Sequence, residues 1–335
     1  MSTTGTRSVG TKSTARTTSG WGRFLGQKAV EVGVALAALI LLTFVLVLLV
    51  PGDPARIAAG LDASVEQVEA ARTALGLDQP IPVQFLHYVT GIFTGDLGQS
   101  FRTGQDVTTI IGVRLPYTLT IALVAIAITL VISVAIGIGV AGLTRGNRNR
   151  WLDVGFSWVT ATLQTLPVYV FGAILVIVFA VSLGVLPAAG ATSPASYVLP
   201  AVALTLAPTC SISRIVRREA AAVLEQDYMR TARGWRIDRI KQHMKYALPN
   251  LLASTLTLSG LILGNMLGGA VIVERVFAWP GLGNGVVEAI LERDYPLIRG
   301  IILTIGVIAI IINVTIDIIL AVVDPRVLRS GKAFA

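Results

Sequence analysis

Long apolar blocks alternate with shorter polar stretches along almost the whole chain. About 20 consecutive apolar residues, each adding 1.5 Å to a helix, cross a hydrocarbon core roughly 30 Å thick. Six blocks reach or approach that length, at about residues 29–50, 117–143, 154–183, 197–215, 251–273 and 297–323. The pattern predicts an all-α, polytopic membrane helical bundle of about six transmembrane helices.

The segments around these blocks are polar. Residues 1–28 are basic and begin rich in Ser, Thr and Gly, which predicts a disordered tail, and a second tail covers 324–335. The first block is longer than the roughly 7–15 residues of a signal-peptide core, so a retained helix is expected. Pro51-Gly52-Asp53-Pro54 then stops the helix. Residues 51–115 are predicted to form a structured segment with short helices such as Ser64–Leu75.

The distribution of charge predicts the orientation. Lys and Arg gather in 1–28, 144–153, 214–249 and 324–335, which together hold 20 of the 27 basic residues. Basic residues favour the cytoplasmic side, so both termini and the 214–249 segment should be cytoplasmic, in the cell (inner) membrane, with 51–115 external. This topology accounts for the net charge of +8 without a nucleic-acid partner.

Composition fits a membrane protein and gives no sign of an enzyme. Only 14% of the residues are charged, and the sequence shows no paired carboxylates, metal-ligand cluster or Ser/His constellation. We therefore expect no enzyme activity, no catalytic residue and no bound metal or cofactor.

The 214–249 segment is longer than a connection between two spans needs. Its apolar residues recur at helical spacing, which predicts short amphipathic helices. One interpretation is a solvated basic loop or a surface for anionic lipid. The other is a folded contact for a partner protein.

The residues of this segment carry a resemblance. Gln226–Arg233, followed by Tyr246–Asn250, resembles the cytoplasmic loop of ABC-importer permeases of the dipeptide/oligopeptide (nickel/peptide) type. On this frame Arg230-Thr231-Ala232 occupy the Glu-Ala-Ala position of the family motif. The family's usual Gly position holds Arg236, with Gly234 two residues earlier. The ATPase-coupling residues implied by the resemblance are Arg230, Thr231, Ala232, Arg233, Gly234, Arg236, Leu248 and Pro249.

Other strings in the same order resemble this family. They are Pro51–Pro54, Gly76–Pro80, Gly95–Gly98, Leu115-Pro116, Glu274–Gly283, Asp294–Pro296 and Asp324–Arg326. The resemblance implies the type I ABC-importer permease fold, a second homologous permease subunit, an external substrate-binding protein and cytoplasmic ATPase subunits that bind ATP and Mg. It also implies di- or oligopeptides as substrate, although similar permeases carry nickel, glutathione and other small solutes.

A short helix seated in a cleft of an ATPase subunit would transmit motion to the membrane helices. Small residues such as Ala232 and Gly234 would allow close approach, and the arginines would supply charge complementarity.

The Glu274–Gly283 string has two interpretations. One is an aromatic interface anchor with a turn. The other is a short re-entrant element that gates the outer mouth and meets the substrate-delivering protein. Its residues of interest are Glu274, Phe277, Trp279, Pro280, Gly281 and Gly283.

The fifth span repeats Gly260, Gly264 and Gly268 on one helix face, which allows close helix packing, either within the chain or at a moving subunit seam. Asn265, Asn313 and Asp317 should face protein or the pathway, because polar groups are costly in lipid. We expect Asp317 to be a satisfied interfacial carboxylate.

An ion-gradient-driven secondary transporter is the alternative from another class. Such proteins show inverted repeats and ionisable groups at mid-membrane. Six spans without a central charge favour the ABC permease.

Overall fold

The computed structural model describes residues 15–49, 52–60, 62–238 and 241–323, and in these ranges every regular element is helical. An isolated bridge between Gln99 and Asp106 is the only strand-like pairing there. The predicted all-α fold is confirmed. The α-helices are α1 (Ala15–Leu49), α2 (Pro54–Ala59), α3 (Val65–Ala74), α4 (Ile81–Thr94), α5 (Val107–Thr144), α6 (Arg150–Gln164), α7 (Val168–Leu175), α8 (Val198–Leu224), α9 (Asp227–Gly234), α11 (Leu248–Val276), α12 (Leu282–Glu292) and α13 (Tyr295–Val323).

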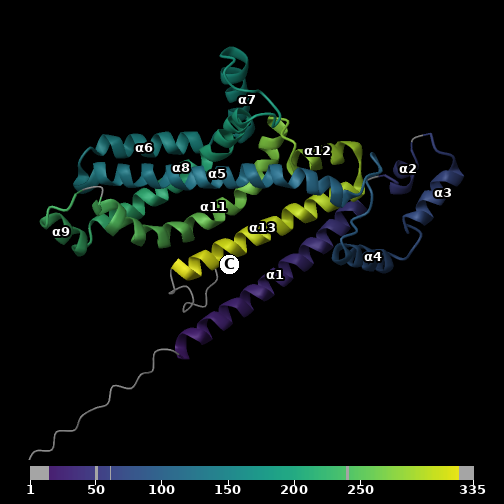
Figure 1. The fold of residues 1–335 in the computed structure, drawn as a ribbon, viewed down its shortest axis with the longest axis horizontal. Coiled ribbons are helices and arrows are strands. Elements are labelled where there is room, and N and C mark those ends of the chain that lie inside the picture. The colour runs from purple at the N-terminus through teal and green to yellow at the C-terminus, as the bar shows by residue number, and fades with distance from the viewer. Residues whose placement is uncertain (1–14, 50–51, 61, 239–240, 324–335) are drawn as a thin grey trace, which may run out of the picture.

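The long helices lie lengthwise beside one another (Figure 1). Helix α8 packs against α5, α6 and α11, while α13 bridges α11 and α1. The main core cluster lies where α5, α8 and α11 meet, and includes the buried residues Ala125, Ile212, Val216 and Val273. Helix α9 lies at one end of the bundle, and α2, α3 and α4 lie at the other. These are called the α9 end and the α2 end below.

The structure shows four or five of the about six predicted spans. Among the described residues, four helices are long and apolar enough to cross a membrane, within Trp21–Leu49, Val107–Thr144, Pro194–Leu224 and Tyr295–Ile319. The pair α6 and α7 makes a fifth if it is one bent span. Helix α11, with 29 residues, has the length for the sixth.

The third span is not the continuous helix predicted over 154–183. Helix α6 ends at Gln164, and the second half, Val168–Ser182, leaves at an angle of 94°. Pro167 causes the break, because it lacks an N–H and disfavours helix at the residue before it. Helix α7 consequently projects from the bundle (Figure 1).

The N-terminal tail is shorter than predicted. Residues 15–28 belong to α1, whereas 1–14 and the predicted tail 324–335 lie outside the described residues. The edge of the Trp21 ring meets Phe24, whose side chain is buried. Lys28 Nζ contacts Asp317 Oδ2 on α13 at 2.9 Å. The Lys28 contact gives the end of this stretch a tertiary partner on α13.

Two other helices extend beyond their predicted bounds. Helix α5 begins at Val107 instead of 117 and contains Pro116, and α8 continues to Leu224 instead of ending at 215. Helix α8 continues through the first charged residues after the fourth apolar block. One of them, Arg217, pairs with Asp153 on α6 at 2.5 Å. Residues 214–224 of the predicted loop are therefore helix.

The predicted structured segment after the first span consists of α2, α3 and α4. The short helix expected at Ser64–Leu75 is confirmed as α3, capped by a reciprocal pair of hydrogen bonds between Ser64 and Gln67. Helix α4 rests on α1, where Phe44 meets Phe85 and Tyr88.

Gly137 offers a test of the α5–α8 packing. A Cβ there would lie 2.5 Å from Val216 Cβ and 2.9 Å from the Arg217 nitrogen, whereas a Cβ at Gly139 meets nothing within 4 Å. We expect Gly137→Ala to destabilise the protein by about 1–3 kcal/mol through overpacking. Thermal unfolding in detergent measures this effect. Gly139→Ala is the control, and an equal melting temperature in both variants would contradict the packing.

Candidate functional site

Helix α9 has one face against the bundle. Met229 and Ala232 are buried at 0% and 4% exposure, and Met229 joins the core cluster that also contains Leu224, Ala247 and Leu251. Because α9 packs on the end of α8 and on the turn Gln242–Ala247, it is held by the body of the protein.

The position of Ala232 corrects the role expected for it. Its side chain is buried within the chain itself, so its small size serves the packing of α9 on the bundle instead of close approach to a partner. Gly234 is exposed, and a Cβ there would meet nothing within 4 Å.

Arginine contacts fix the geometry around α9. Arg233 Nη1 donates to the Leu224 carbonyl oxygen at 3.0 Å, which satisfies one of the free carbonyls at the end of α8. Arg145, after α5, pairs with Glu225 at 3.1 Å. The ends of α5, α8 and α9 are therefore tied together, and Arg233 acts from inside the chain.

The end of α9 locates the tight turn. Arg236 N donates to the Arg233 carbonyl and Ile237 N to the Ala232 carbonyl, which is the Schellman pattern. Arg236 has φ 55°, in the left-handed region where glycine is usual. It therefore occupies the family's Gly position conformationally as well as by sequence, at a cost of about 1 kcal/mol. Gly234 lies inside α9 and does not form the turn.

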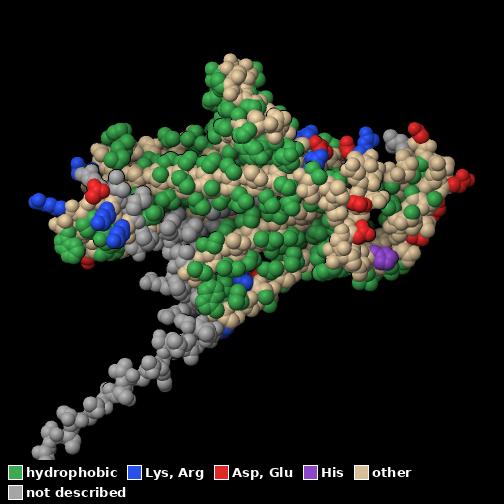
Figure 2. All heavy atoms as spheres, viewed as in Figure 1, with side chains coloured by type: hydrophobic (Ala, Val, Ile, Leu, Met, Phe, Trp, Pro, Cys, Tyr) green, Lys and Arg blue, Asp and Glu red, His purple; other side chains and the backbone are tan. Residues whose placement is uncertain are grey.

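The outward side of α9 is aromatic and basic. Trp235 is 77% exposed and the Arg230 side chain 65% exposed. Blue side chains gather at this end of the molecule (Figure 2). The exposed residues of the helix and its turn are Asp227, Tyr228, Arg230, Thr231, Gly234, Trp235 and Arg236. Trp235 is not among the coupling residues expected from the sequence, although a lone tryptophan in a polar segment can indicate a contact surface for a partner protein. Leu248 and Pro249 begin α11, as the resemblance implies for the return to the membrane.

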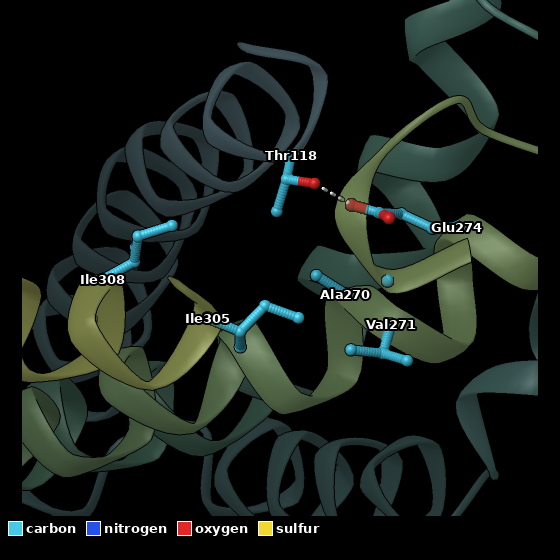
Figure 3. Close-up of a pocket in the computed structure, with 7 residues that line it drawn as sticks. Thr118, Ala270, Val271, Glu274, Ile305 and Ile308 are labelled. Atoms are coloured by element: carbon cyan, nitrogen blue, oxygen red, sulfur yellow. Dashed lines mark hydrogen bonds between the residues drawn. The ribbon is translucent and has the colours of Figure 1, made fainter. Parts of the chain in front are cut away.

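A second candidate site surrounds Glu274, which lies near the end of α11 and is 1% exposed. Thr118 on α5 donates to Glu274 Oε1 at 2.7 Å (Figure 3). Asn284 N at the start of α12 donates to Oε2 at 3.1 Å. Thr118 also accepts from Leu282 N at 2.8 Å. One carboxylate thus links three helices, and it faces the N-terminal end of α12, where a negative charge is favoured.

Gly281 and Gly283 allow the chain to wrap around this carboxylate. A Cβ on Gly281 would collide with the carboxyl group of Glu274, and one on Gly283 would lie 2.5 Å from Val271 Cα. The remaining cavity beside Glu274 measures only about 10 Å³. The group therefore lines no space large enough for a solute in this conformation.

Trp279 is fully buried, which excludes the interpretation of it as an interface anchor facing lipid. Its ring meets the Tyr197 and Tyr117 rings edge-on, with the centroids 4.6 and 6.3 Å away, and its Nε1 donates to the Tyr117 carbonyl at 3.2 Å. The preceding Ala278 has φ 43°, in the left-handed region of the backbone. Phe277 is also buried.

The polar side chains that surround this turn are not among the residues expected from the sequence. Asn284 accepts from Arg275 Nη1 at 3.2 Å and donates to Glu288 at 2.8 Å. Glu288 pairs with Arg114 of α5 at 2.8 Å. Their spacing at 275, 284 and 288 carries no recognisable sequence pattern.

Asp294 plays a similar part at the start of α13 and is 1% exposed. It accepts hydrogen bonds from Ser100 Oγ at 2.5 Å and Phe101 N at 3.2 Å. The Asp294–Pro296 string therefore anchors the segment that precedes α5.

The glycine face of α11 is used only in part. A Cβ on Gly264 would lie 2.5 Å from Asn313 Oδ1 on α13, whereas one on Gly268 meets nothing within 4 Å. The surroundings of Gly260 and the side chain of Asn265 lie outside the described part of the chain. Packing within the chain is established at Gly264. Asp317 is a satisfied carboxylate, as expected, through Lys28.

Thr118 and Thr120 make a matched test of the Glu274 site. Thr118→Val removes a donor to the buried carboxylate and an acceptor for Leu282 N, and we expect a loss of about 1–3 kcal/mol for each group left unsatisfied. Thr120 bonds only the Pro116 carbonyl of its own helix and is exposed, so Thr120→Val should be nearly neutral. Thermal unfolding compares the two, and similar melting temperatures would contradict the role assigned to Thr118.

Comparison with known families gives two matches along the chain. The family described as binding-protein-dependent transport system inner membrane component matches residues 133–329. Its N-terminal companion, the binding-protein-dependent transport system membrane component, N-term, matches residues 22–122.

Individual relatives agree with this assignment. A protein of Brucella suis biovar 1 (strain 1330), which carries the name of a peptide transport system permease, is 40% identical over 295 residues, covering 86% of this chain and 93% of its own. The glutathione transport system permease of Pectobacterium atrosepticum is 38% identical over 295 residues, covering 87% and 94%.

A solved structure supports the fold. The inward-facing MetNI methionine ABC transporter aligns with a TM-score of 0.54 at 18% identity, covering 64% of this chain and 96% of the other. The chain therefore belongs to the binding-protein-dependent transport system inner membrane components, and it is a permease subunit of an ABC importer of the dipeptide/oligopeptide type.

Proposed function

We propose that this chain forms half of a translocation pathway for small peptides, and that α9 is the helix through which ATPase subunits move it. The observation that carries the proposal is the two-sided character of α9. Its inner face is locked to α8 and the core by Met229 and Ala232, while Trp235 and Arg230 lie exposed. A rigid helix with an exposed aromatic and basic side is suited to transmit a push from a bound partner.

The orientation follows from charge. Both termini and α9 face the cytoplasm in this proposal, because the basic residues of 1–28, 144–153, 214–249 and 324–335 favour that side. The α9 end then meets cytoplasmic ATPase subunits, which bind ATP and Mg, while this chain binds neither. The α2 end and α12 face an external substrate-binding protein, and a second homologous permease completes the pathway.

The proposed substrates are di- and oligopeptides. The support is the names of two relatives, one for peptide transport and one for glutathione, which is itself a tripeptide. Nickel or another small solute is the alternative, because the substrate choice of such importers also depends on the external binding protein.

Coupling is tested on the exposed side of α9. We expect Arg230→Glu combined with Trp235→Ala to weaken co-purification of ATPase subunits by at least roughly tenfold, since buried aromatic and Arg anchors dominate interfaces. Arg102→Glu is the matched control, because Arg102 is similarly exposed, at 71%, at the other end of the molecule. A loss of co-purification supports the coupling role only when the melting temperature of the double variant equals that of wild type. Undiminished assembly and substrate-stimulated ATP hydrolysis in the double variant would refute the coupling role.

The substrate is tested by uptake. Cells lacking this chain should lose accumulation of a labelled tripeptide, and the intact gene should restore it. Excess unlabelled dipeptide should compete with the label, whereas Ni²⁺ should not. Loss of nickel accumulation with unchanged peptide uptake would contradict the peptide assignment and leave the α9 proposal standing.

A further inference from the structure

A second, much larger cavity lies at the α2 end. It measures about 570 Å³ and lies between the last turns of α1, the segment 52–54, helices α3 and α4, and the first turns of α13. Figure 2 shows the molecule hollowed between the bundle and the α2–α4 segment. Its volume is in the range of ligand pockets, about 300–1,000 Å³.

The cavity wall carries a cation without a counter-ion. The Arg299 guanidinium lies 5.2 Å from the centroid of the Tyr88 ring, and within the described part of the chain this is its only polar or ring contact. Arg299 is partly buried. A guanidinium withdrawn from water is unfavourable until it meets an anion, and its planar fork suits an oxyanion.

The carboxylates on the same wall are already engaged. Asp53 binds Arg72 at 2.6 Å, and Asp96 Oδ1 accepts from Gly98 N at 2.9 Å. His87 and Tyr88 are the other titratable groups on this wall. Among the described residues no salt bridge joins Arg299 to Asp53 or Asp96, so its N–H groups are left for a ligand.

The position of the cavity favours lipid over transported solute. Helix α1 is at the edge of the molecule, packed chiefly on α13 and α4 (Figure 1). Leu48 near the end of α1 lines the cavity and exposes its apolar side chain. Arg299 lies about one turn inside α13, which is the depth at which cationic and aromatic side chains meet headgroups.

We propose that this cavity binds the headgroup of an anionic phospholipid, whose phosphate carries a net negative charge that the choline group of a zwitterionic lipid would offset. Arg299 donates to the phosphate oxygens from its place over Tyr88, and the acyl chains follow the apolar side of α1 and α4. The site lies apart from α9 and from the Glu274 turn, so it stands whether or not their proposed roles hold.

The test uses the full chain purified with the subunits that accompany it. Native mass spectrometry counts bound dioleoylphosphatidylglycerol, with dioleoylphosphatidylcholine as the zwitterionic comparison. We expect Arg299→Gln to hold phosphatidylglycerol roughly tenfold more weakly. Arg102→Gln, which changes an exposed arginine at the same end, should bind as wild type does. Arg299→Lys keeps the charge and should retain intermediate binding, which covers the case that the glutamine variant does not fold.

Three outcomes would overturn the proposal. One is equal retention of phosphatidylglycerol by wild type and both Arg299 variants. Another is equal binding of phosphatidylcholine. The third is displacement of the lipid by trialanine in an Arg299-dependent manner, which would assign the cavity to the transported solute.

Discussion

The buried carboxylate of Glu274 is the contact on which the junction of α5, α11 and α12 depends. An ionisable group at 1% exposure has to be met by hydrogen-bond donors, and here the donors come from α5 and from the first turn of α12. The requirement fixes where α11 ends, where α12 begins and how both lie on α5. It also accounts for the two glycines, since a Cβ at either position would collide with the group or with α11.

The α9 end is held by ionic contacts of another kind. Arg217 with Asp153 and Arg145 with Glu225 join α5, α6 and α8, and Arg233 caps the last carbonyls of α8. Between the two ends lie helices of 27 and 29 residues, α8 and α11, which share one core cluster. In the coupling role proposed for α9, a displacement applied there would move these helices as rigid bodies, since packed interiors resist continuous deformation.

Hydropathy was sufficient to predict the fold class and the approximate number of spans, because each span has to bury its own backbone hydrogen bonds in lipid. Local chemistry was sufficient for α3, whose Ser64 cap is readable in sequence. The 94° break at Pro167 was missed because the apolar run continues through it. The inward direction of Ala232 and the Asn284 network were also missed, since both depend on contacts between segments far apart in the chain.

The seam between α1 and α13 joins the first membrane helix to the last. Lys28 meets Asp317 across almost the whole length of the polypeptide. During translation, at about 5–20 residues per second, α1 is made tens of seconds before its neighbour emerges. Throughout that interval α1 lies in the bilayer without α13. Closure of this seam is consequently among the last events of biogenesis, and a truncation that removes α13 leaves Lys28 with Glu31 of its own helix as its remaining ion pair among the described residues.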